Sequence, residues 1–197
     1  MTQSSLKHQF ISVLFFILVS LQSMAFAQEN DTIQCQTIIL PEGWFMFSSY
    51  ISPVQTNLYD LLYSLISDGS MILVKDENGA AILPEWGWNG IGYFSNFKGY
   101  QIKMSVEDSL EICGDKIDIV DLQVQILSGW SFLSYLHDYE EEVDVFFEDV
   151  STSILIVKDF SGGVYLPEYN YNGIGNLEPG NGYQIKMNSS QTLIYSN

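Results

Sequence analysis

Short apolar runs separated by glycine and proline turns occur twice along this chain, in the same order and at nearly constant spacing. Blocks of identical residues begin at Val74, Leu83, Asn89 and Gly99, and each returns 83 residues later. A Gly-Trp pair that precedes them, ending at Trp44, returns after 86 residues. A constant interval over several motifs identifies an internal repeat.

The pattern within each unit predicts short strands around one helix. Runs rich in β-branched and aromatic residues, bounded by turn residues, predict strands. In the first unit they cover 33–40, 44–51, 71–74, 80–83, 100–104 and 110–113.

Apolar residues spaced three and four apart predict a helix from Leu58 to Ile66, which Asn57 can cap, and another from Val143 to Val150. The turn residues Asn78-Gly79 predict a hairpin, and Ser161-Gly162-Gly163 predicts its counterpart. We therefore predict an α+β or mainly β fold of two homologous units, each an antiparallel sheet with one short amphipathic helix.

Changes in composition set the expected boundaries. They give a signal peptide at 1–27, a first repeat unit at 28–114, a linker at 115–121 and a second repeat unit at 122–197. The signal is predicted from Lys7, an apolar run from Phe10 to Leu21 and the small residues Ala25 and Ala27. No later stretch is long and apolar enough to span a membrane, so we expect no transmembrane segment in the mature chain.

Two cysteines, Cys35 and Cys113, fall on the predicted first and last strands of the first unit. In an exported protein such a pair is expected to form a disulfide. A redox or metal-binding pair would need closer spacing or further ligands. We therefore predict a disulfide, and neither a metal site nor a cofactor.

The chain is strongly acidic. It contains 24 acidic residues against 7 basic ones, and its formal net charge is −17. This charge argues against nucleic acid as a partner, because the phosphate backbone is bound by clustered basic residues. The acids are scattered and not spaced as a calcium loop, so we interpret them as a solvated surface, with divalent-cation binding as the alternative.

The order Gly-Trp, short helix, Val-Lys-Asp, Pro-Glu, Asn-Gly-Ile-Gly and Gly-Tyr-Gln-Ile-Lys resembles a tandem repeat of exported Bacteroidota proteins. The resemblance covers nearly all of residues 38–197. It implies a secreted or cell-surface module for which no activity is established. Proteins of that family often end in a type IX secretion sorting domain. No such domain follows the second repeat here, so a periplasmic location is a second expectation.

Few residues indicate catalysis. His137 has no counterpart in the first unit, and we expect it on the surface before a helix. The repeat-matched acids are Asp76, Asp159, Glu85 and Glu168. Such carboxylates can act in glycoside hydrolysis. We favour a structural role, with the aspartates bonding to the hairpin turn and Glu85 pairing with Lys75 or Lys103. We therefore expect no enzymatic activity.

Aromatic residues in the loop after each hairpin are the best candidates for binding. The candidate residues are Trp86, Trp88 and Asn89 in the first unit and Tyr169, Tyr171 and Asn172 in the second. Exposed rings can stack on sugars while the asparagines supply hydrogen bonds. Two other interpretations stay open: the rings fold back as lids over the sheet, or they contact a protein partner. Trp44 and Trp130 follow turn glycines, and we expect both in the core.

These observations favour a secreted, non-enzymatic module for interaction or assembly, whose partner is a protein surface or a second copy of the chain. The alternative is a carbohydrate-binding module that holds a polysaccharide through the paired loop aromatics.

Overall fold

The computed structural model describes residues 33–195, so the predicted signal peptide lies outside the described residues. The first repeat contains β1 (Gln34–Leu40), β2 (Gly43–Phe47), β3 (Ile51–Pro53), α2 (Leu58–Leu61), α3 (Tyr63–Ser67), β4 (Met71–Lys75), β5 (Ala81–Leu83), the 3-10 turn η1 (Pro84–Trp86), β6 (Trp88–Asn89), β7 (Tyr100–Met104) and β8 (Asp108–Lys116).

The second repeat follows the same plan. It contains β9 (Gln123–Ile126), β10 (Gly129–Ser134), β11 (Glu141–Glu142), α4 (Val143–Phe146), the 3-10 segment η2 (Glu148–Ser153), β12 (Ile154–Lys158), β13 (Val164–Leu166), the 3-10 turn η3 (Pro167–Tyr169), β14 (Tyr171–Asn172), β15 (Asn176–Leu177), β16 (Gly182–Met187) and β17 (Gln191–Ile194).

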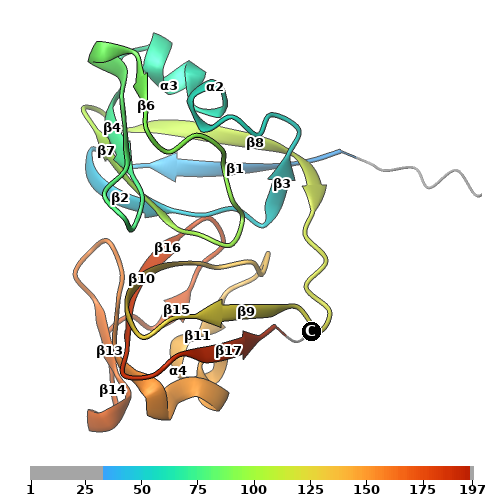
Figure 1. Cartoon of the computed structure of the whole chain (residues 1–197), viewed down its shortest axis with the longest axis vertical. Coiled ribbons are helices and arrows are strands. Elements are labelled where there is room, and N and C mark those ends of the chain that lie inside the picture. The colour runs from blue at the N-terminus through green and yellow to red at the C-terminus, as the bar shows by residue number, and fades with distance from the viewer. Residues whose placement is uncertain (1–32, 196–197) are drawn as a thin grey trace, which may run out of the picture. The chain divides into compact units, whose positions relative to one another are not determined.

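Each repeat is built on a five-stranded antiparallel sheet, and Figure 1 labels all of its strands except β5 and β12. The strand order is β2-β7-β4-β5-β6 in the first repeat and β10-β16-β12-β13-β14 in the second. Strands that match in sequence occupy matching places, and both sheets carry a register shift in the strand before the hairpin. The predicted mainly β fold of two homologous units is confirmed.

Smaller sheets complete each repeat. Strand β8 pairs with β1 and β3 in the first repeat, whereas β17 pairs only with β9 among the described residues. Strand β8 continues to Lys116, past the predicted boundary at residue 114. The predicted disulfide joins Cys35 and Cys113, which lie opposite each other on β1 and β8.

The helices are shorter than the apolar stripes predicted. In the first repeat the stripe is divided between α2 and α3, because Leu62 adopts a non-helical backbone between them. Asn57 caps α2 as expected, and its Oδ1 accepts a hydrogen bond from the amide of Tyr59. In the second repeat a single turn, α4, is followed by the 3-10 segment η2. Leu58, Leu62 and Leu65 are nevertheless buried against the sheet, as the periodicity predicted.

Two glycines bring the repeats into close contact. A Cβ atom added to Gly99 would lie 2.9 Å from the carbonyl oxygen of Leu133, and one added to Gly182 would lie 3.0 Å from that of Phe47. These two contacts are related by the sequence repeat. The pairing is therefore reciprocal, as in a twofold-symmetric dimer. Ser48 adds a hydrogen bond from its hydroxyl to the carbonyl oxygen of Asn181.

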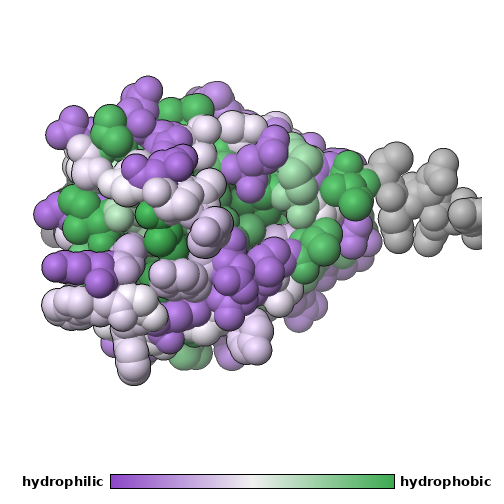
Figure 2. All heavy atoms as spheres, turned by 90° about the horizontal axis from the view of Figure 1, so that it is seen from above, coloured by the Kyte–Doolittle hydropathy of each residue, from purple (hydrophilic) through white to green (hydrophobic). Residues whose placement is uncertain are grey.

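Within the described residues, no helix is long and apolar enough to cross a membrane. Viewed from above, small groups of hydrophobic residues lie among hydrophilic ones (Figure 2).

Candidate functional site

The loop aromatics of both repeats are exposed to solvent. Trp86, Trp88, Tyr169 and Tyr171 expose between 53% and 73% of their surface. A 3-10 turn that starts at proline places the first ring of each pair, and a left-handed residue, Gly87 or Asn170, then redirects the chain into β6 or β14. The rings are therefore not buried lids.

The neighbouring asparagines hold the loop itself. Asn89 Oδ1 accepts hydrogen bonds from the amides of Ile91 and Gly92, at 3.1 and 2.8 Å. Asn89 Nδ2 donates to the carbonyl oxygen of Gly92 and to Asn57. Asn172 Oδ1 likewise accepts from two loop amides. Because these groups are engaged, Asn89 has little capacity left to bond a ligand, while the more exposed Asn172 keeps part of its amide accessible.

Trp44 and Trp130 are surface residues, so their predicted place in the core is wrong. Trp44 is 42% exposed and Trp130 is 50% exposed. Each indole lies against two lysine ammonium groups from neighbouring strands. Lys75 and Lys103 lie 5.1 and 5.5 Å from the Trp44 ring centroid. Cation–π attraction at this range stabilises the ammonium groups over the ring.

The second repeat contains the same arrangement. Lys158 and Lys186 lie 5.2 and 5.6 Å from the Trp130 ring centroid. The predicted ion pair of Glu85 with Lys75 or Lys103 is not formed, since none of the three ion pairs among the described residues includes these side chains. The lysines at repeat-matched positions therefore contact the tryptophans and form no ion pair with the matched glutamates.

Strand register places the tryptophan–lysine group and a loop aromatic on one sheet face. Trp44 lies opposite Lys103, Lys103 opposite Leu73, and Leu83 opposite Trp88. The pairing of β4 with β5 places Leu73 beside Leu83. Because side chains on paired strands share a face, these five residues form one row across the sheet.

An equivalent row crosses the second sheet. It consists of Trp130, Lys186, Ile156, Leu166 and Tyr171. The opposite face of each sheet is the core, where Phe45, Ile102 and Val74 are buried in the first repeat. We call each solvent-facing row an aromatic row: Trp44 to Trp88 in the first repeat and Trp130 to Tyr171 in the second. Aromatic side chains at the two ends, with lysines between, are suited to holding an extended ligand.

The repeat-matched aspartates hold the hairpin turns, as predicted. Asp76 Oδ1 accepts hydrogen bonds from the amides of Asn78 and Ala80, both at 2.9 Å. Asp159 Oδ1 accepts from the amide of Gly163 at 2.7 Å. One grouping of described residues brings three potential metal ligands together, Cys35, Glu111 and Cys113, and the disulfide occupies both of its sulfur atoms.

His137 is buried, so its predicted surface position is wrong. It is 2% exposed and occupies the place of Ile51 in the first repeat. Its ring lies 4.6 Å from that of Tyr139 and 5.3 Å from that of Tyr195, measured between centroids. Nε2 has no hydrogen-bond partner in the described structure, and Nδ1 faces only the carboxylate of Glu141. Burial lowers the pKa of His137 below 6.5, and the carboxylate of Glu141, 3.1 Å from Nδ1, opposes that shift.

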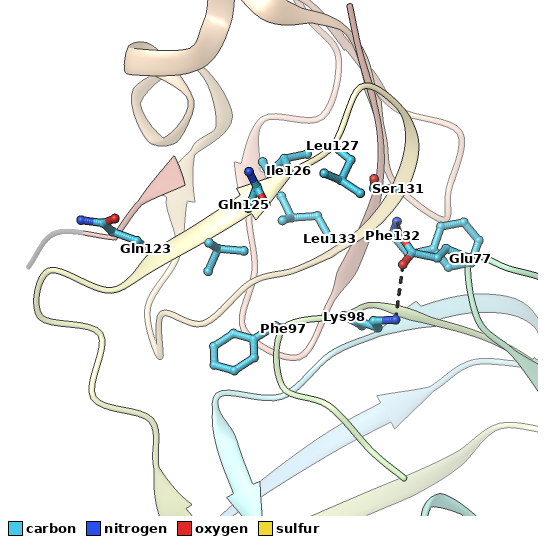
Figure 3. Close-up of a pocket in the computed structure, with 11 residues that line it drawn as sticks. Glu77, Phe97, Lys98, Gln123, Gln125, Ile126, Leu127, Ser131, Phe132 and Leu133 are labelled. Carbon is cyan, nitrogen blue, oxygen red and sulfur yellow. Dashed lines mark hydrogen bonds and ion pairs between the residues drawn. The ribbon is translucent and has the colours of Figure 1, made fainter. Parts of the chain in front are cut away.

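A groove of about 430 Å³ lies between the repeats (Figure 3). Glu77 lines it, accepting a hydrogen bond from the amide of Phe132 and pairing with Lys98 at 3.5 Å. In the repeat-related place Phe160 packs on Phe45 with ring centroids 4.4 Å apart. The sequence repeat matches Phe160 with Glu77, and Phe45 with Ser131. The groove therefore exists because two aromatic rings are replaced by smaller polar side chains.

Sequence reasoning found the loop aromatics but missed the lysine-flanked tryptophans. A signal was present, since four lysines recur at matched positions and Trp44 and Trp130 recur with them. Comparison with known proteins adds no further assignment: no family model, curated protein or solved structure matches this chain.

Proposed function

We propose that the protein is a non-enzymatic binding module that holds a polysaccharide chain on its two aromatic rows. The observation that supports this is the alignment of Trp44 and Trp88 at the two edges of one solvent-facing sheet. Four strand spacings separate the edges, a span of about 19 Å at roughly 4.8 Å per spacing. That span suits an extended polymer better than a single small molecule.

The chemistry of the row also favours a sugar polymer. The apolar C–H face of a pyranose ring packs on the electron-rich face of an indole. The half-buried Leu73 and Leu83 give a flat apolar surface between the rings. Gln101, next to Lys103 on the same face of β7, offers amide hydrogen bonds to hydroxyl groups. The row thus combines stacking with polar contacts, without a deep cleft.

Binding measurements with aromatic-row variants test the proposal. The chain without its predicted signal peptide would be titrated calorimetrically with a panel of soluble polysaccharides. Its affinities would be compared with those of the Trp44→Ala/Trp88→Ala variant. The loss of two stacking platforms is expected to weaken binding at least about tenfold, which corresponds to about 1.4 kcal/mol.

Tyr63 provides the matched control, because it is an exposed aromatic on α3, away from the row. Tyr63→Ala should leave affinity unchanged. An equal loss in both variants, or no binding to any polysaccharide, would contradict the proposal.

Protein assembly is a second candidate, favoured by one specific observation. Strand β17 pairs with β9 along one edge, and no described strand pairs with its other edge. An unpaired edge can add a strand from another protein. Light scattering of the titration samples over a range of concentrations would detect self-association, and Ile194→Lys on this edge should abolish it. A monomer at every concentration would exclude self-assembly as its role.

A further inference from the structure

The lysines of the described chain divide into two groups. Lys98 pairs with Glu77 at 3.5 Å, and Lys116 pairs with Asp138 at 2.6 Å. The other four described lysines make no ion pair with a described residue, and all lie within 6 Å of the Trp44 or Trp130 ring centroid. Every described lysine without an acidic partner therefore lies in an aromatic row or beside one.

Acidic residues are missing from the same strand positions. The solvent-facing positions of β2, β7, β4, β5 and β6 that surround the first row hold Trp44, Gln101, Lys103, Leu73, Lys75, Ala81, Leu83 and Trp88. None of these is acidic, although the chain has 24 acidic residues. The matched positions in the second repeat hold Trp130, Gln184, Lys186, Ile156, Lys158, Val164, Leu166 and Tyr171, again without an acid.

The aspartates that follow two of these lysines are bonded to the hairpin turns. Asp76 follows Lys75 in the chain, but its carboxylate is held in the hairpin turn by backbone amides. Asp159, after Lys158, is held in the same way. At physiological ionic strength the Debye length is about 8 Å, so charges farther away than this are largely screened. The distant acids that make up most of the net charge of −17 are therefore screened at each tryptophan, whereas two ammonium groups lie 5.1 to 5.6 Å from its ring centroid.

We propose that the ligand of the aromatic rows is an acidic polysaccharide, one whose sugar units carry carboxylate or sulfate groups. This proposal rests on the proposed function, since it specifies the chemistry of the polymer that the rows hold. The ring of a sugar unit packs on Trp44, and its anionic group lies against Lys75 and Lys103. Ammonium groups bind such anions as compact point charges.

Each chain carries two equivalent rows, and a polymer long enough to reach both would bind bivalently. The second contact with the same polymer is intramolecular, so the effective concentration of its anionic groups is high. Affinity is therefore expected to rise with polymer length, and removing the lysines of one row should cost more on a long polymer than on a short oligomer.

The test compares a charged polymer with the uncharged ester of the same backbone. Polygalacturonate would be titrated against the exported chain, with fully methyl-esterified polygalacturonate as the uncharged polymer of the same backbone and dextran sulfate as the sulfated probe. Binding to polygalacturonate is expected to be at least about tenfold tighter than binding to its methyl ester, and to weaken with added salt.

Lysine variants locate the site. Lys103→Gln/Lys186→Gln removes one ammonium group from each row and should weaken polygalacturonate binding at least about tenfold. Lys98→Gln/Lys116→Gln makes the same change in net charge at the two ion-paired lysines and should have little effect. Thermal unfolding of both variants would confirm that each is folded.

The outcomes separate this inference from the proposed function. If the methyl ester binds as tightly as the acid and Trp44→Ala/Trp88→Ala weakens both, the rows bind polysaccharide and the acidic assignment is overturned. If no polysaccharide binds, both proposals fail. If single-stranded oligothymidine competes as well as polygalacturonate, the rows recognise polyanions in general and the assignment to a polysaccharide is wrong.

Discussion

The environment of His137 gives the second repeat a buried titratable group that the first repeat lacks. The ring is surrounded by Tyr135, Tyr139, Phe146 and Tyr195, and Glu141 is the nearest carboxylate. In the first repeat the same place is occupied by the apolar Ile51. The two repeats should therefore differ in how their stability depends on pH.

We expect the unfolding free energy to fall as the pH is lowered below 6.5. The unfolded chain takes up a proton at the ordinary histidine pKa of 6.5, whereas burial keeps the folded pKa of His137 lower. The stabilising contribution of the neutral ring is fully present above pH 6.5 and is lost as the pH falls through the depressed pKa.

Denaturant unfolding at about pH 7.5 and about pH 5.5 would measure this loss. The His137→Ile variant carries the residue that the first repeat has at this position, so it should fold and should lose less stability between the two pH values. Equal losses in both proteins would show that other groups titrate instead.

Residue roles were predicted well where they depend on local chain geometry. Asp76 and Asn57 perform the turn and capping roles that their neighbours in sequence indicate. The predicted burial of Trp44 and the predicted exposure of His137 were wrong, because burial depends on which strands lie alongside. Trp44 reaches lysines on β7 and β4, and that arrangement follows from strand order, which sequence alone does not give.

Strands β1 and β8 frame the first repeat, and the disulfide joins them at directly opposed residues. The matching strands β9 and β17 are shorter and carry no such bond. The first repeat therefore relies on a covalent link where the second relies on packing alone, with Tyr195 and Leu193 buried in its core.

Removing the disulfide is expected to lower the unfolding free energy by about 4 kcal/mol. The bond closes a loop between residues 78 apart, and the chain-entropy model relates that length to the stabilisation. Urea denaturation of Cys35→Ser/Cys113→Ser would measure the change, and reduced wild-type protein should match the variant. A change below about 1 kcal/mol would show that the entropic model does not apply here.

Elements with strong turn signals were predicted best. The Asn-Gly hairpin and its Ser-Gly-Gly counterpart form where expected, between β4 and β5 and between β12 and β13. The lengths of the helices were overestimated, because a short α-helix followed by a 3-10 segment gives the same spacing of apolar residues. In the second repeat the segment before β12 is three residues shorter, which leaves room for one α-helical turn before η2.

At the scale of the whole molecule, Gly99 and Gly182 determine how closely the repeats approach. A Cβ atom placed on Gly182 would lie 3.3 Å from the Cα atom of Gly99, and a Cβ atom on either glycine would meet a backbone carbonyl of the other repeat. Backbone atoms cannot move aside as flexible side chains do. The glycine of the Gly-Tyr-Gln-Ile-Lys motif is thus required by the pairing of repeats.

Adding a methyl group at either glycine should destabilise the molecule by about 1–3 kcal/mol through overpacking. Gly99→Ala and Gly182→Ala would be compared by thermal unfolding with Ser109→Ala, an exposed substitution on β8. Unchanged melting temperatures in both glycine variants would show that the repeats can separate slightly at no cost.

The reciprocal contact has a consequence for how such repeats can be multiplied. Each repeat uses the same surface, its motif glycine and the end of its β2 or β10 strand, to bind the other. Once two repeats have paired, neither has a copy of that surface left, so the contact cannot propagate into a filament. A longer chain assembled by this contact would therefore contain its repeats in pairs, and an odd repeat would expose an unmatched glycine surface.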